Sequence, residues 1–146
     1  STARLLRLAV NDSNLPVMGR TAQGPMLMRL LPGETVVGAA DVGSSGAVLL
    51  ASRLGQIKRL DAQQLRPCLR GDLGQIGLQF LNRQDQLVDL QPDNGGVVSV
   101  RLNNEGMHQR FSSADLAVDD PAGTGTQLQL SSDQQISELI PLISSP

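Results

Sequence analysis

The sequence predicts an all-β fold made of three copies of one blade-like repeat, and three observations lead to this. Apolar and polar residues alternate over short runs, which indicates strands with one buried face. Gly-rich and Pro-Gly segments separate these runs and are typical of tight turns. Residues 55–90 align without gaps beneath residues 3–38 at an offset of 52, and a weaker third copy starts at Gly106. Each copy is about four short strands in roughly 50 residues, as in a propeller blade.

The repeats divide the chain into one incomplete blade and two further blades. Leading strands are expected at residues 46–51 and 97–102, ahead of the second and third copies. The first copy has no leading strand, so we expect the chain to be a fragment. The predicted blades are residues 1–42, residues 43–93 and residues 94–146, the last with an acidic C-terminal end.

The first blade is expected to contain a β-hairpin. Residues 26–30 and 35–37 alternate in the manner of strands, and Pro32 and Gly33 between them indicate a tight turn. Met26 and Met28 then fall on the buried face and belong to the core rather than to a ligand-binding stripe.

Charge is distributed unevenly along the chain, although the net charge is only −2. Residues 1–84 hold ten Lys and Arg against five Asp and Glu, whereas residues 85–146 hold two against nine. A basic front and an acidic rear predict a polyanionic partner for the front alone. Eleven of the twelve cations are Arg, which suits bidentate contacts to phosphate.

The composition argues against catalytic, metal and membrane roles. Cys68 is the single cysteine and His108 the single histidine, so an internal disulfide and a structural zinc site are excluded. No glycine loop has the phosphate-binding pattern of a nucleotide site, and no serine motif accompanies His108. We expect no catalytic residue, no metal and no cofactor. We also expect a cytoplasmic protein, because no apolar run approaches a membrane span.

Two stretches carry a resemblance to a known family. The first is Gly19-Arg20-x-x-Gln23-Gly24 with the alternating run that follows it, and the second is residues 48–59, VLLASRLGQIKR. These stretches resemble the blade signature of the C-terminal domain in the A subunit of bacterial DNA gyrase, and the related domain in the A subunit of topoisomerase IV. The resemblance spans essentially the whole chain and is faint in the third copy.

The resemblance implies a β-pinwheel of four-stranded blades, about three of them present, whose basic rim bends and wraps duplex DNA. Such a rim meets phosphates and need not read bases. The implied partners are double-stranded DNA, the rest of a topoisomerase A subunit, plus the ATPase B subunit, in a nucleoid-associated holoenzyme. The cleavage step itself needs a tyrosine, and the chain has none.

Repeat position selects the candidate DNA-binding residues. Recurrence favours a DNA role for Arg7, Arg59 and Arg110, whereas a lone surface Arg often serves only solubility. The full set is Arg7, Arg20, Lys58, Arg59, Arg70 and Arg110, with Arg29, Arg53, Arg66 and Arg83 as secondary candidates.

Other interpretations stay open at this point. The Gln-Arg-Arg-Gly-Gly-Lys-Gly box of gyrase does not occur, so a gyrase-like parent, a topoisomerase-IV-like parent and a divergent paralogue all fit. The chain also fits a protein–protein or self-assembly module that forms a homodimer through open blade edges. A third alternative is a divergent repeat retained as a spacer, which fits the acidic third copy.

Overall fold

The computed structural model describes residues 2–43, 46–103 and 107–142. Every regular element in these segments is a β-strand or a short 3-10 turn, which confirms the all-β prediction. No described helix is long and apolar enough to cross a membrane. Gly106, where the third copy is expected to start, and residues 143–146 lie outside the described residues.

The second and third units have the same order of elements. Each element of the third unit starts 49–52 residues after its counterpart in the second. The second unit contains β3 (Ala47–Ser52), β4 (Gln56–Asp61), the 3-10 turn η1 (Ala62–Gln64), β5 (Pro67–Cys68), β6 (Gln75–Ile76) and β7 (Leu87–Pro92). The third contains β8 (Val97–Leu102), β9 (His108–Ser112), the 3-10 turn η2 (Ser113–Asp115), β10 (Val118–Asp119), β11 (Thr126–Gln127) and β12 (Ile136–Pro141). Both expected leading strands are confirmed as β3 and β8.

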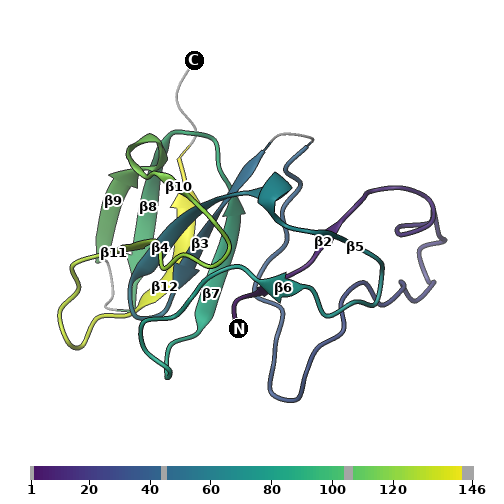
Figure 1. Cartoon of the computed structure of the whole chain (residues 1–146), viewed down its shortest axis with the longest axis horizontal. Coiled ribbons are helices and arrows are strands. Elements are labelled where there is room, and N and C mark those ends of the chain that lie inside the picture. Colours follow the sequence, from purple (N-terminus) through teal and green to yellow (C-terminus); the bar gives the residue numbers. More distant parts are fainter. Residues whose placement is uncertain (1, 44–45, 104–106, 143–146) are drawn as a thin grey trace.

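The first unit is far less regular, and the hairpin expected within it is wrong. Its strands are β1 (Arg4–Leu5) and β2 (Arg7–Leu8), and the rest runs as open chain at one side of the molecule (Figure 1). A turn does form at residues 32–33, but only the bridge from Met28 to Asp72 flanks it. Met26, expected in the core, is 67% exposed. The physical reason is that the described first unit contains no counterpart of β3 for these residues to pair with.

Successive units interlock through their short strands. In the second unit, β5 runs parallel to β2 of the first unit, and β6 runs antiparallel to β1. In the third unit, β10 and β11 make the same two pairings with β4. We refer to these pairings as the first joint and the second joint. The predicted blade boundaries stay a prediction, because the sheets are completed across them.

Each joint depends on one glycine. Gly74 in the first joint has φ +76°, and Gly125 in the second has φ +67°. A Cβ at either position would collide with a backbone carbonyl oxygen of the preceding unit, that of Leu5 or Ile57 respectively. Glycine therefore permits both the backbone conformation and the close approach.

Two apolar clusters lie between the units, one on each side of β3. Val48 and Leu50 face a cluster shared with the first unit, whereas Leu49 and Ala51 face one shared with the third. Because both faces of β3 are buried, this strand is apolar almost throughout. The two clusters hold the three units, and hence their surface cations, in fixed relative positions.

Candidate nucleic-acid interface

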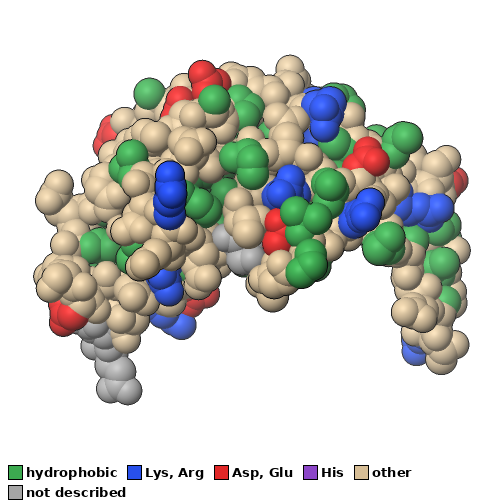
Figure 2. All heavy atoms as spheres, turned by 60° about the horizontal axis from the view of Figure 1, so that its bottom comes forward, with side chains coloured by type: hydrophobic (Ala, Val, Ile, Leu, Met, Phe, Trp, Pro, Cys, Tyr) green, Lys and Arg blue, Asp and Glu red, His purple; other side chains and the backbone are tan. Residues whose placement is uncertain are grey.

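Basic side chains are concentrated on the first two units. Figure 2 shows more blue than red over the half of this face that the N-terminal units form. Seven arginines are exposed, and five of these lie before residue 85: Arg20, Arg29, Arg66, Arg70, Arg83, Arg101 and Arg110.

Lys58, predicted to lie on the DNA-binding rim, is an interior residue. It is 1% exposed, and its Nζ donates to the carbonyl oxygens of Gly77 at 2.8 Å and Gly123 at 3.0 Å. Burial lowers the pKa of the Lys58 ammonium, and the nearby Asp119 and Asp120 carboxylates partly oppose this. Phosphate has no access to this ammonium, so Lys58 leaves the candidate set.

Arg7 and Arg59 recur for a structural reason. Arg7 Nη1 donates to the Leu65 carbonyl at 3.0 Å, just after the 3-10 turn of the next unit. Arg59 Nη1 lies 3.4 Å from the Leu116 carbonyl, the equivalent atom one repeat later. Each arginine thus holds the turn of the following unit against its own strand. Their recurrence by itself is therefore no indication of DNA contact.

Arg59 is also neutralised by an acid. Its Nε lies 2.6 Å from Oδ2 of Asp93, whose side chain is only 2% exposed. Burial alone would raise the pKa of Asp93, but the Ser113 hydroxyl, the Gly95 amide and the Arg59 guanidinium lower it on balance. The pair contributes no net charge to the surface.

Arg110 occupies the third equivalent position without a turn to hold. It is exposed on β9, and its guanidinium makes no hydrogen bond or ion pair with a described residue, although its backbone pairs with Ser99 of β8. The edge of β9 away from β8 likewise has no strand partner in the described part of the chain, whereas β4 carries both β10 and β11.

Three other arginines surround a surface hollow at the first joint. Arg4, Arg29 and Arg66 line a space of about 430 Å³, together with Asp72 and the glycine loop at residues 71–74. We call this the basic hollow. The sequence singled out Arg29 and Arg66 only as secondary candidates and did not single out Arg4, because none of the three recurs between repeats.

Backbone contacts fix the walls of the basic hollow. The Arg29 amide donates to the Asp72 carbonyl at 2.9 Å, and the Gly71 amide donates to the Leu27 carbonyl at 2.8 Å. On the other wall, the Arg66 amide donates to Oε1 of Gln75 at 2.6 Å. The guanidiniums therefore extend from a rigid base.

Glu34 partly neutralises the positive charge at one end of the basic hollow. Its Oε1 lies 3.3 Å from Nε of Arg4 and accepts from the Thr2 hydroxyl at 2.6 Å, while Oε2 accepts from the Leu31 amide at 2.8 Å. The Thr2 and Leu31 hydrogen bonds, with the Arg4 charge, lower the pKa of Glu34 to about 2. Arg29 and Arg66 have no such acidic partner within the described residues.

The second joint lacks the three arginines that line the basic hollow. Gln56 stands at the position equivalent to Arg4, and its Nε2 donates to the carbonyls of Gln79 at 2.9 Å and Thr124 at 2.8 Å. Leu81 and Ala117 stand where Arg29 and Arg66 stand in the first joint. Neutral side chains thus take the places of all three arginines at the second joint, and Lys58, which also lies there, is buried.

Comparison with known proteins identifies the family. The family model described as "DNA gyrase C-terminal domain, beta-propeller" matches residues 4–42 and 47–104. The chain belongs to this family. Within the gyrase C-terminal family, the interlocked units are the blades of a β-pinwheel, and the basic hollow lies between the first two.

Individual relatives agree with this assignment, and a solved structure agrees with the fold. The chain is 33% identical over 99 residues to the A subunit of DNA topoisomerase 4 from Synechocystis, covering 68% of this chain and 11% of the relative. It is 29% identical over 137 residues to the A subunit of DNA gyrase from Thermotoga maritima, covering 92% and 17%. A crystal structure of the C-terminal domain of DNA topoisomerase IV superposes with a TM-score of 0.61 at 19% identity, covering 71% of this chain and 32% of that one. The chain thus spans about a tenth to a sixth of the curated relatives.

The two remaining candidates lie on the surface of the first two blades. Arg70 immediately precedes the glycine loop that lines the basic hollow, and it is exposed. Arg20 is exposed within the open segment of the first blade. Of the six predicted residues, Arg20, Arg70 and Arg110 are free to meet a phosphate, and Arg70 adjoins the hollow.

Proposed function

We propose that this chain is a non-catalytic domain that binds and bends double-stranded DNA, as part of the A subunit of a type II DNA topoisomerase. The observation that carries the proposal is the basic hollow between two blades of the gyrase C-terminal family. The relatives' names, as the A subunits of gyrase and of topoisomerase 4, supply the enzyme class. Supercoiling or topology control is then the process that the domain supports.

The hollow suits a DNA backbone because its charge is positive, fixed and unpaired at two of three arginines. Guanidinium groups contact phosphate in a bidentate manner. Each neutralised phosphate releases condensed counterions, so binding should weaken steeply as salt rises. A rigid patch that holds the DNA backbone where two blades meet, with Arg20 and Arg70 nearby in sequence, favours bending without base recognition.

Partners follow from the same proposal. The rest of the A subunit would supply strand cleavage, the ATPase B subunit would supply energy, and the domain would act on chromosomal DNA in the nucleoid without a cofactor of its own. A homodimer through open blade edges stays a prediction. It is tested by sedimentation of the same samples that are used for DNA binding.

The test is a gel-shift titration on linear duplexes of about 40 and 150 base pairs across a salt series. The double variant Arg29→Gln/Arg66→Gln should weaken binding and reduce the slope of log K against log salt by about 2, since each phosphate contact contributes roughly 0.9. Arg101→Gln is the matched control, because Arg101 is exposed in the third unit and already paired with Glu138 at 2.7 Å.

Two results would contradict the proposal. One is that the wild-type chain shifts neither duplex at low salt. The other is that Arg29→Gln/Arg66→Gln and Arg101→Gln reduce the slope equally, which would mean that the hollow has no special part in binding.

A further inference from the structure

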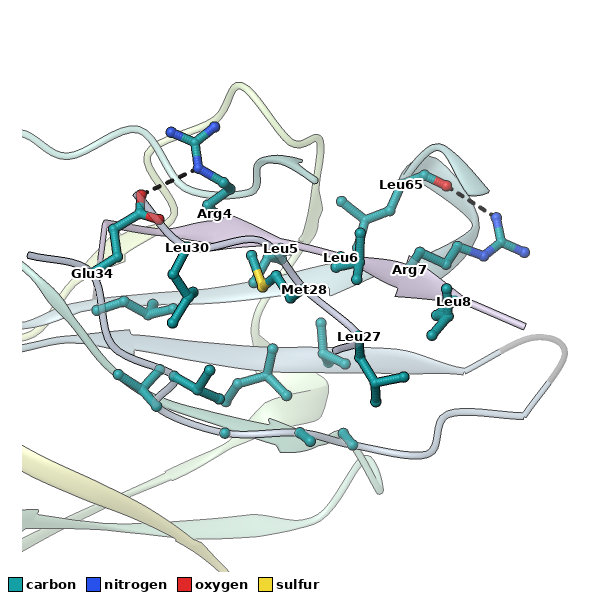
Figure 3. A pocket seen from close by; sticks show the side chains of 18 of the residues that line it. Arg4, Leu5, Leu6, Arg7, Leu8, Leu27, Met28, Leu30, Glu34 and Leu65 are labelled. Carbon is teal, nitrogen blue, oxygen red and sulfur yellow. Dashed lines mark hydrogen bonds and ion pairs between the residues drawn. The ribbon is translucent and has the colours of Figure 1, made fainter. Parts of the chain in front are cut away.

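The first unit contains a second cavity, an apolar groove of about 600 Å³. It lies between β1–β2 and residues 35–42. Figure 3 shows Leu6, Leu27 and Met28 in the space between β1–β2 and the neighbouring segments. Val48 and Leu87 of the second unit line the groove from the first core cluster. Leu6, Leu27 and Met28 are only half-buried, and the apolar groove that they line is not filled by any described part of the chain.

The other two units show what occupies this place. In the second unit, β3 lies between β4 and β7 and is antiparallel to both. In the third unit, β8 lies in the same way between β9 and β12. The repeat offset equates β1–β2 with β4, and residues 35–40 with β7. Both flanks of a central strand are thus present in the first unit, and the described chain provides no strand between them.

The register of the second unit can be transferred residue by residue. Leu50 pairs with Lys58 on one side and Leu90 on the other, which correspond to Leu6 and Gly38 in the first unit. The pairings of Val48, Leu49 and Ala51 transfer in the same way. All eight positions obtained by this transfer line the groove: Leu5, Leu6, Arg7, Leu8, Val37, Gly38, Ala39 and Ala40.

The backbone along one flank is also unpaired. Residues 36–40 belong to no strand, and none of them exchanges a backbone hydrogen bond with another described residue. Free amides and carbonyls along an extended segment are a template for an added strand. The apolar lining and the unpaired backbone therefore both favour binding of an extended apolar strand.

We infer that the groove is a strand-addition site, which accepts one extended apolar segment of six residues antiparallel to both flanks. The occupant is the leading strand of another repeat of this kind. The two leading strands in the chain, AVLLAS and VVSVRL, define its chemistry: each has one wholly apolar face and contains no proline. This site shares only Arg4 with the basic hollow and does not depend on DNA binding.

The test uses the full chain and a synthetic peptide with the sequence of residues 96–103, GVVSVRLN. Hydrogen exchange is followed by NMR with and without peptide. We expect the amides of residues 36–40 to exchange quickly in the free chain and at least tenfold more slowly with peptide. A peptide with proline in place of its serine should give no protection, since proline removes a central ladder hydrogen bond.

A variant of the chain distinguishes binding in the groove from nonspecific hydrophobic binding of the peptide. Leu6→Asp places a charge in the groove and should weaken peptide binding at least tenfold. Leu81→Asp is the control, because Leu81 is 66% exposed and lies outside the groove. The inference is overturned if the peptide gives no protection, if the proline peptide protects equally, or if residues 36–40 are already protected in the free chain. Protection of β3 and β4 amides in each variant verifies that the chain is folded.

Discussion

Replacing Arg59 by alanine should destabilise the chain much more than its surface position in the repeat suggests. The Arg59 side chain is 24% exposed, but its partner Asp93 is only 2% exposed, at 2.6 Å. Removing one member of a buried ion pair costs about 3–5 kcal/mol, because the other charge is left uncompensated. Because Arg59 is partly exposed, solvent screening reduces this cost. We expect Arg59→Ala to lose about 2–3 kcal/mol in the free energy of unfolding.

Arg101 provides the matched comparison. Its Nη1 lies 2.7 Å from Oε1 of Glu138, nearly the same separation, but these side chains are 54% and 41% exposed. Exposed pairs of this kind contribute about 0–1 kcal/mol. Arg101→Ala should therefore cost little, so burial of the acid and not the presence of an ion pair sets the difference.

Urea unfolding of the two variants measures both costs directly. The double variant Arg59→Ala/Asp93→Ala should lose less stability than the sum of its two single variants, because it leaves no buried charge unpaired. If Arg59→Ala costs no more than Arg101→Ala, then Arg59 is not a structural link between units. Its recurrence would again favour a DNA contact.

Three further predictions concern Gly125 in the second joint, the carboxylate of Glu34 and the buried Lys58. Gly125→Ala should lower the free energy of unfolding by at least about 3 kcal/mol, and Gly95→Ala by only about 1–2 kcal/mol. Both glycines have positive φ, but only a Cβ at Gly125 would collide with the Ile57 carbonyl. Equal losses in urea unfolding would contradict this. Since the pKa of Glu34 is lowered from 4.5 to about 2, its contribution to stability is full above pH 4.5 and is lost as the pH falls towards 2. The stability difference between wild type and Glu34→Gln should shrink over that interval in acid-titrated unfolding, and a constant difference would count against it. Lys58→Met should leave the salt slope of DNA binding unchanged, because the ammonium is inaccessible; a reduced slope in the gel-shift series would return Lys58 to the interface.

The sequence predicted the regular parts of the fold because they repeat. Residues 46–51 and 97–102 carry apolar runs that follow glycine-containing turns, and they form β3 and β8 as expected. The hairpin of the first unit was not predictable from local alternation. Residues 26–37 have a strand-like pattern, but pairing requires a neighbouring strand that the described chain does not supply.

The interface was harder to predict because recurrence has two physical causes. Arg7 and Arg59 recur as links to the following turn, and Lys58 is drawn into the second joint by two carbonyl oxygens. Arg4 and Arg66 carry no repeat signal, since neutral residues take their places in the second joint. Their grouping arises only when the first two units interlock.

The most direct test of the proposed function is a nick-closure experiment on a small circular duplex. Ligase seals the nicked circle with and without saturating chain, and the topoisomers are separated after the protein is removed. A domain that bends and wraps DNA should shift the linking-number distribution, and Arg29→Gln/Arg66→Gln should abolish the shift. An unchanged distribution at a chain concentration that fully retards the same circle would contradict wrapping, and would reduce the basic hollow to a site of simple phosphate binding.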